Sequence, residues 1–563
     1  MNIRYEEIPY ADYPNPKFRR QGYTLLDGWA NIAFFDENGK KAKEGKILLP
    51  YAYETEASGV GDEKMYPHIE YDFDFEAEKN RPCLLRFLAV DYACNVFLNG
   101  VNLGKHKGGY TEFYFDVSDV LIKGKNHLHV EVDDSYSPDQ LRGKQRCRPE
   151  NYECWYVQTS GIYQSVYLEE CGSTYVSKCL FSGDKSGKVD YLIELNRKEN
   201  IEWTISFKGR VIRTFSEGGK RIYKGVFYLE NPRVWNVNEP NLYDVRIRVL
   251  GEIEDRVETY FGCRSIETAR GNLYVNGQRE FLKLILNQGY REKKGVSLSK
   301  RDVFEDFVRM KEFGFNGCRI HQKIEIPFMY YLADLFGFYL WNELPSCYRY
   351  SPEAKEEIER ELFPIIDRNY NSPSIIVHLL FNESWGIPEI KASEETQNYV
   401  ASLVERVRKY DPSRLIVAND GWNNLSCSDL ISLHEYEQNA EVFFGEYRDK
   451  DRVIEEKIVN GYGKALADRQ FYRGQPIVIS EFGGVSLSNQ NGWGYGEKAA
   501  DGNDLEKRIS SLLETIGRLD YLSGYCYCQL TDVEQETNGL LTADRKCKLN
   551  AEEIRKIVEG VKL

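Results

Sequence analysis

The chain has 563 residues, which is more than one hydrophobic core normally organises, so the sequence predicts several domains. A formal net charge of -14 and the lack of any basic stripe argue against nucleic acid or an anionic membrane as a partner. The 13 cysteines are scattered, and the sequence has neither a signal-like start nor a membrane-length apolar run, so we expect reduced thiols and a cytoplasmic location. The seven histidines show no paired ligand spacing, and no metal or other cofactor is predicted.

Two β-rich segments come first in the chain. Residues 1–172 alternate apolar and polar side chains in short runs, which is the period of half-buried strands, and we expect a jelly-roll sandwich there. Within it, Asn99-Gly100 lies between two strand-like runs and predicts a tight hairpin. Residues 173–268 repeat the pattern over a length that suits a small immunoglobulin-like sandwich.

The pattern changes over residues 269–563, where apolar runs alternate with amphipathic helical patterns. Eight of these runs indicate buried parallel strands: residues 281–286, 315–320, 338–344, 374–381, 414–420, 429–436, 476–482 and 524–530. Eight strand and helix units predict a (β/α)8 barrel, also called a TIM barrel. The gap between the fifth and sixth runs is short, so we expect one unit of the barrel to be imperfect.

Two of the predicted strands end in glutamate. The fourth is followed by Asn382 and Glu383 in FNESWG, and the seventh closes on Glu481 in SEFGG. The active site of such a barrel forms at the C-terminal ends of its strands, and strands four and seven lie far enough around the ring for their side chains to face each other. Two surface glutamates are the alternative interpretation.

Paired carboxylates are what the cleavage of a glycosidic bond needs. One protonates the leaving oxygen while the other, about 5 Å away, attacks the anomeric carbon. We therefore assign Glu383 as the acid and later the base, and Glu481 as the nucleophile. Asn382 is expected to donate a hydrogen bond to a sugar hydroxyl beside the reacting carbon.

The ordered set of motifs resembles glycoside hydrolase family 2. Asn-Glu and Glu-Phe-Gly after apolar strands are accompanied by SGIYQSVYLE (160–169), NPRVWNVNEPNLYDV (231–245), FGCRSIE (261–267), LYVNGQREFLKL (273–284) and MKEFGFNGCRIHQ (310–322). The resemblance covers nearly the whole chain. It implies a sugar-binding-like jelly roll, an immunoglobulin-like sandwich, a catalytic barrel and the activity of a retaining, exo-acting β-glycosidase.

The resemblance extends to residues around the two acids. Arg319, at the end of the second strand, matches the family arginine that helps to keep the nucleophile ionised, with a salt bridge at the barrel rim as the alternative. Tyr436 matches the tyrosine that hydrogen-bonds the nucleophile, with a plain rim aromatic as the alternative. We interpret His321 as a hydrogen-bond partner of the substrate in preference to a core histidine.

Five weaker candidates complete the predicted site. His434 lies in the sixth strand, and Trp422 and Trp493 are expected either to stack on a sugar or simply to pack. Glu343 ends the third strand and would line the pocket floor or make a structural hydrogen bond. Lys323 would present a cation to a sugar carboxylate.

The sugar is the least determined part of the prediction. A β-galactoside is the leading expectation, on the prevalence of that activity in the family, and glucuronides, galacturonides, mannosides and arabinosides are the alternatives. Residues 528–541 lack the Asn-x-Lys motif that resembles uronate recognition in the family's glucuronidases, which argues mildly against a glucuronide. A catalytically silent carbohydrate-binding protein, transglycosylation by the same intermediate and a homo-oligomer stay open.

Overall fold

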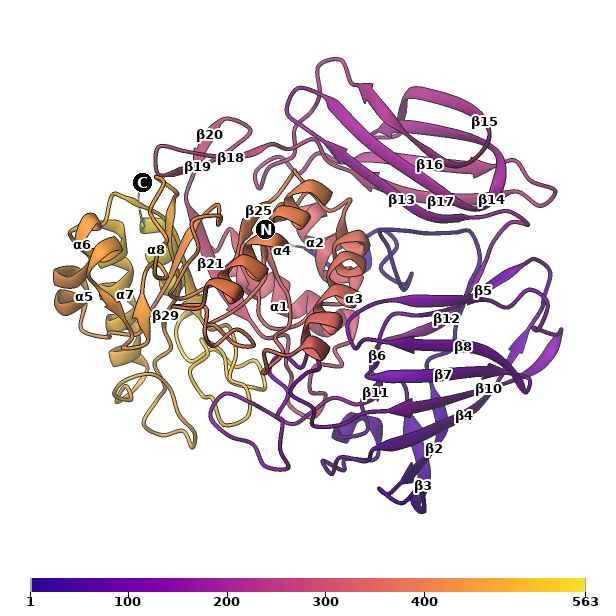
Figure 1. The fold of residues 1–563 in the computed structure, drawn as a ribbon, viewed down its shortest axis with the longest axis horizontal. Helices are drawn as coiled ribbons and strands as arrows, with labels where there is room; N and C mark the ends of the chain where they lie inside the picture. Colours follow the sequence, from indigo (N-terminus) through magenta and orange to yellow (C-terminus); the bar gives the residue numbers. More distant parts are fainter. Residues whose placement is uncertain (1–2, 562–563) are drawn as a thin grey trace.

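Three bodies of secondary structure follow one another along the chain (Figure 1). The computed structural model of the protein describes residues 3–561. Two β-rich parts, coloured indigo to magenta, lie on one flank of a mixed α/β part, coloured pink to yellow (Figure 1). In the described part of the chain, no helix combines the length and the apolar character that a membrane crossing requires.

The first part is a sandwich of two antiparallel sheets that share one buried core, to which Leu85, Val96 and Val130 contribute. Asn99 and Gly100 join two strands of this part with positive φ angles of 50° and 79°, which confirms the predicted hairpin. The four-stranded sheet contains β1 (Tyr23–Leu25), β12 (Val166–Glu170), β5 (Cys83–Phe87) and β9 (Phe113–Asp116). The six-stranded sheet contains β3 (Lys41–Leu48), β2 (Trp29–Phe35), β4 (His68–Ala77), β10 (Gly124–Asp133), β7 (Ala93–Leu98) and β8 (Val101–Lys107). The small elements are η1 (Tyr5–Glu7), η2 (Glu56–Ser58), β6 (Val90–Asp91) and β11 (Gly161–Ile162).

The second part is built from five antiparallel strands around aromatic side chains. They are β13 (Val176–Gly183), β14 (Lys188–Phe207), β15 (Arg210–Tyr228), β16 (Tyr243–Val249) and β17 (Asp255–Phe261). The first half of β14 pairs with β13 and its second half with β16, so this long strand belongs to both halves of the sandwich. Trp203 is fully buried and stacks on Phe215 with 3.9 Å between ring centroids.

A three-stranded ladder leads from the second part into the barrel. It consists of β18 (Ile266–Ala269), β19 (Asn272–Val275) and β20 (Gln278–Glu280). The predicted division between residues 268 and 269 falls inside β18, and the division between residues 172 and 173 falls in the loop between β12 and β13.

The third part is a barrel of eight parallel strands, one for each apolar run that the sequence analysis selected. In chain order they are β21 (Leu282–Asn287), β22 (Gly317–Ile320), β23 (Tyr339–Glu343), β24 (Ile375–Leu379), β25 (Leu415–Val417), β26 (Ile431–Glu435), β29 (Ile477–Gly483) and β30 (Leu522–Cys528). Continuous pairing runs from β25 round to β26, and hydrogen bonds such as His434 N–H to the Gly421 carbonyl (3.2 Å) join its two ends. The predicted (β/α)8 barrel is therefore confirmed.

Helices cover the outside of this barrel. They are α1 (Lys300–Glu312), α2 (Pro327–Phe336), α3 (Pro352–Asn369), α4 (Glu394–Tyr410), α5 (Ala440–Tyr447), α6 (Lys450–Glu455), α7 (Gly502–Gly517) and α8 (Ala551–Gly560), with a small hairpin of β27 (Ile458–Val459) and β28 (Gly463–Lys464). Among the described residues, no helix separates β25 from β26, which is the imperfect unit expected from the short gap.

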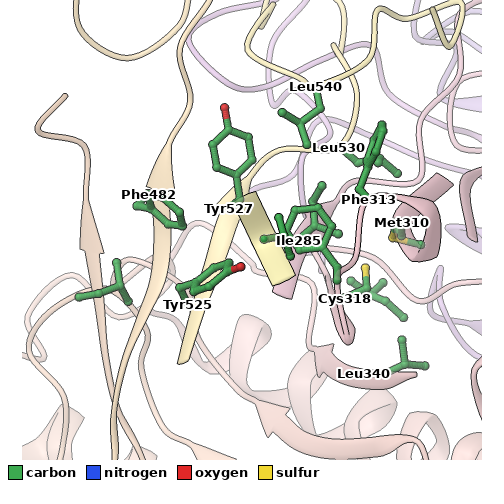
Figure 2. Packing of buried hydrophobic residues seen from close by; sticks show 14 of the residues in the cluster. Ile285, Met310, Phe313, Cys318, Leu340, Phe482, Tyr525, Tyr527, Leu530 and Leu540 are labelled. Carbon is green, nitrogen blue, oxygen red and sulfur yellow. The ribbon is translucent and has the colours of Figure 1, made fainter. Parts of the chain in front are cut away.

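Each barrel strand is buried on both faces. Side chains that point inward, such as Leu284, Trp341 and Val377, fill the interior of the ring. Side chains that point outward pack under the helices, and Figure 2 shows Ile285 and Tyr525 in this outer layer. Burial on both faces explains why the strands appear in the sequence as continuous apolar runs and why a polar residue at a strand end stands out.

Candidate active site

Polar side chains gather at the C-terminal ends of the barrel strands. They are Arg319 (β22), Glu343 (β23), Asn382 and Glu383 (after β24), Asp420 (after β25), His434 (β26), Tyr436 (after β26) and Glu481 (β29). Because the strands are parallel and form a ring, these side chains meet over one mouth of the barrel.

Glu383 and Glu481 face each other in this mouth. A carboxylate oxygen of each lies within 4.8 Å of the other and of a ring nitrogen of His434. Nδ1 of His434 is 2.8 Å from Oε1 of Glu383 and 3.5 Å from Oε2 of Glu481. Two carboxyl groups this close leave room for a sugar carbon but not for an additional water between them.

Glu481 is held in position by a cation and a phenol. NH1 of Arg319 lies 3.0 Å from its Oε1, and the hydroxyl of Tyr436 donates a short hydrogen bond to its Oε2. The Glu481 side chain is 6% exposed, so it has little freedom to leave these partners. The contacts that the sequence analysis expected of Arg319 and Tyr436 are thus present.

Arg319 is the centre of what we call the floor network, which consists of Arg319, Glu343, Asp420 and His434. Its Nε donates to Glu343 at 2.8 Å, and its NH1 lies 2.5 Å from Asp420. Burial favours the neutral form of both acids, but the guanidinium outweighs burial and lowers the pKa of Glu343 to about 2 and that of Asp420 below its usual range. All three side chains are fully buried, so the floor is a fixed array of paired charges.

His434 links this floor to Glu383. Its two ring nitrogens each lie 2.8 Å from a carboxylate, Nδ1 from Glu383 and Nε2 from Asp420. Burial alone would lower the pKa of His434, but the negative charges of Glu481 and Asp420 raise it to about 10. At neutral pH the imidazole therefore carries both ring protons; it donates to Asp420 and to Oε1 of Glu383, which leaves Oε2 of Glu383 for the proton that a general acid requires.

Asn382 retains one polar atom without a partner. Its Oδ1 accepts from NH2 of Arg319 at 2.7 Å, whereas its buried Nδ2 has no hydrogen-bond acceptor among residues 3–561. A buried donor left unpaired costs free energy unless a ligand supplies the acceptor. Glu383, the next residue, has a φ of 49°, a strained backbone conformation of the kind found at functional sites. Both features fit a sugar that binds against Asn382 and Glu383.

The remaining charged candidates are paired within the protein. Nδ1 of His321 lies 3.1 Å from Glu343, and the His321 ring lines the cleft described below. Glu343 is fully buried beneath Arg319, which corresponds to the structural alternative for this residue. Lys323 lines the cleft, and its ammonium lies 3.0 Å from Glu325, so a sugar carboxylate there would share this lysine with an internal partner.

The two tryptophan candidates pack against protein. Trp422 is 6% exposed, stacks on Tyr462 at 4.7 Å and meets His434 edge-on, so it supports the histidine from behind. Nε1 of Trp493 donates to the carbonyl of Glu153 at 3.0 Å, which ties the barrel to the first part of the chain.

The first part also contributes to the site, which the sequence analysis did not foresee. Residues 138–160, which we call the roof loop, extend over the barrel mouth. The N–H groups of Arg142 and Gly143 donate to the carbonyl of Ser346 at 2.9 and 3.0 Å, and the ring of Trp155 lies 5.3 Å from that of Trp385. Between the roof loop and the barrel rim is a cleft of about 250 Å³, and its lining includes Lys144, Tyr156, Gln288, His321 and Glu534.

Several residues of the site were missed. Asp420 ends the apolar run RLIVAND as Glu481 ends its own run, so the same signal was available in the sequence. Tyr495 stacks on Tyr436, and Glu536 accepts a short hydrogen bond from Tyr156 of the roof loop. Tyr495 and Glu536 lie in irregular loops, so neither residue spacing nor a position at a strand end indicates a role for them.

Two groups of potential metal ligands occur among the described residues. Glu70, His129 and Glu131 form one on the surface of the first part, and Glu383, His434 and Glu481 form the other. In the second group, both ring nitrogens of His434 already contact carboxylates, Nδ1 that of Glu383 and Nε2 that of Asp420.

Comparison with known proteins places all three parts in one family. Residues 58–171 match the sugar binding domain of glycosyl hydrolases family 2, residues 167–264 match a second domain of that family, and residues 266–501 match its TIM barrel domain. A putative β-glucuronidase of Formosa agariphila is 26% identical over 63% of this chain and 44% of its own length. A β-galactosidase of Clostridium acetobutylicum is 24% identical over 89% of this chain and 57% of its own length. The chain thus spans about half the length of these curated relatives.

Solved structures share the fold over nearly the full chain. The β-glucuronidase of Bifidobacterium dentium complexed with coumarin-3-O-glucuronide has a TM-score of 0.80 at 18% identity, over 97% of this chain and 98% of its own. A β-galacturonidase of Eisenbergiella tayi bound to galacturonate has a TM-score of 0.77 at 17% identity, with the same two coverages. The three domain models match in order along the chain, and two glutamates face each other at the mouth of the barrel. The chain therefore belongs to glycoside hydrolase family 2.

Proposed function

We propose that the protein is a retaining β-glycosidase that removes one terminal sugar from a glycoside. The observation that carries the proposal is the approach of the Glu383 and Glu481 carboxylates to within 4.8 Å. At that spacing one carboxylate reaches the anomeric carbon directly, whereas the carboxyl groups of an inverting pair stand farther apart to admit a water.

The reaction has two steps. Glu383 gives its proton to the glycosidic oxygen while an oxygen of Glu481 bonds to the anomeric carbon and the aglycone departs. Glu383 then removes a proton from water, which displaces Glu481 and restores the original configuration. Arg319 and Tyr436 keep the attacking carboxylate in place, and the unpaired Nδ2 of Asn382 donates to a hydroxyl of the bound sugar.

For the sugar, a β-galactoside and a uronide are the two main candidates. The curated relatives include both β-galactosidases and β-glucuronidases, and the solved structures with this fold include a β-galacturonidase. The unpaired ammonium of Lys144, which lines the cleft, is the specific observation that favours a uronide, and it is developed below. Mannosides and arabinosides complete the set of substrates to compare.

A panel of nitrophenyl β-glycosides, with the product anomer followed by NMR, tests this function. We expect hydrolysis with retention, and a loss of at least about 1,000-fold in kcat/KM for Glu383→Gln or Glu481→Gln. Glu389→Gln, in an exposed residue of the same segment, is the matched control and should retain activity. Sugar binding without turnover of any glycoside would instead identify a silent carbohydrate-binding protein, and inverted product would exclude the two-step mechanism. Added alcohols reveal any transglycosylation as alkyl glycoside products.

A further inference from the structure

The roof loop fixes the position of one lysine, Lys144. The preceding residue, Gly143, has a φ of 56°, and a Cβ atom there would lie 2.0 Å from the carbonyl oxygen of Gln322, so the loop rests directly on the barrel rim. The carbonyl of Lys144 accepts a hydrogen bond from the N–H of Tyr156 at 2.9 Å, and this bond joins two segments of the roof loop. The backbone on both sides of Lys144 is therefore held against the cleft.

The side chain of Lys144 extends toward the reacting groups. Its ammonium lies 5.2 Å from the centroid of Trp385, two residues after Glu383, and 5.9 Å from that of Tyr156. Burial favours the neutral amine, but Cys154 and, after it, the negative charges of Glu536, Glu481 and Glu383 raise the pKa of Lys144. The ammonium is thus charged at neutral pH and is attracted by both catalytic carboxylates.

Lys144 neighbours the thiol of Cys154 but forms no ion pair with a carboxylate in residues 3–561, whereas the other lysines that line the cleft are ion-paired. The ammonium of Lys323 lies 3.0 Å from Glu325, and that of Lys293 lies 3.2 Å from Glu56. The surrounding acids favour the charged form of Lys144, but none of the described carboxylates forms an ion pair with it, so its N–H donors stay open to a ligand anion. Lys144 is therefore the cleft-lining lysine at which a ligand anion would meet no internal carboxylate partner.

We propose that Lys144 determines glycone specificity by pairing with a carboxylate of the terminal sugar, so that the preferred substrate is a uronide. The inference rests on the proposed glycosidase function and narrows it. The cation comes from the first domain and not from the loop after the eighth barrel strand. Cleavage of a uronide then depends on the position of the roof loop as well as on the residues of the barrel.

Matched substrate pairs that differ only at C6 test the inference: nitrophenyl β-galactoside against β-galacturonide, and β-glucoside against β-glucuronide. Wild type should prefer one of the uronides, and Lys144→Met should lower kcat/KM for that uronide by about 100-fold or more, mainly through KM, with less than about a threefold change for the neutral partner. Lys144→Arg keeps the charge and should recover part of the loss. Lys293→Met makes the same chemical change in a paired lysine of this cleft and should leave the ratio unchanged.

Binding measured without turnover separates this inference from the proposed function. In a Glu481→Gln background, calorimetric titration with galacturonate and glucuronate should show binding that Lys144→Met abolishes and Lys144→Arg partly restores. A wild type that prefers the neutral glycosides, or a Lys144→Met variant that weakens neutral and acidic sugars equally, would overturn the role of Lys144 and leave the glycosidase proposal intact. If wild type hydrolyses no glycoside, the proposed function fails, and the titration still decides whether Lys144 binds a uronate.

Discussion

The floor network and the roof loop differ in how completely their charges are paired. In the floor network, Arg319 contacts Glu343, Asp420 and Glu481, and His434 uses both ring nitrogens on carboxylates. In the roof loop, Lys144 has no counter-ion among the described residues. The barrel thus holds the two proposed catalytic carboxylates in place before a substrate binds. The roof loop instead presents a lysine whose ion-pair partner would come from the substrate.

The largest effect is expected from removing Arg319, the cation of the floor network. Arg319→Met leaves Glu343 and Asp420 buried without a counter-charge, and we expect the free energy of unfolding to fall by about 3–5 kcal/mol, with loss of most activity. Denaturant unfolding measures the effect. Arg349→Met is the control, since that arginine pairs with Asp139 on the surface, is 58% exposed and should cost less than about 1 kcal/mol. Equal stability of the two variants would contradict the role given to the floor.

A smaller effect is expected from a substitution that displaces the roof loop without changing any charged residue. Gly143→Ala places a Cβ against the Gln322 carbonyl at a φ of 56°, so the loop must shift, and we expect about a tenfold loss of kcat/KM with a stability cost of about 1–3 kcal/mol. Gly209→Ala is the matched control, because it has a φ of 78° but no atom within 4 Å of the added carbon. The loss of kcat/KM should be confined to Gly143→Ala, and a similar loss in both variants would indicate that the roof does not govern the site.

The last prediction concerns the proton held by His434. Its folded pKa of about 10 exceeds the ordinary value of 6.5, so its contribution to stability is complete below pH 6.5 and is lost as pH rises toward 10. Unfolding measured from pH 6 to pH 10 should show a shallower decline for His434→Asn than for wild type, and parallel pH profiles would contradict the raised pKa.

The barrel was predictable from sequence, and the roof was not. Strands such as β24 and β29 are buried on both faces, so each appears as a continuous apolar run, and Glu383 and Glu481 stand out at the ends of such runs. Asp420 carries the same signal and was overlooked. Lys144 and Glu536 lie in loops whose positions depend on contacts between domains, and no local pattern in the sequence encodes those contacts.

The measurement that tests the central claim most directly is the identification of the residue that becomes bonded to the sugar. The protein would be treated with an activated 2-deoxy-2-fluoro glycoside of the preferred sugar, digested and analysed by mass spectrometry. The account predicts one fluoroglycosyl group on the peptide that contains Glu481, and none on the Glu481→Gln variant. A label on Glu383 or on any other residue, or turnover that proceeds with inversion and leaves no label, would contradict it.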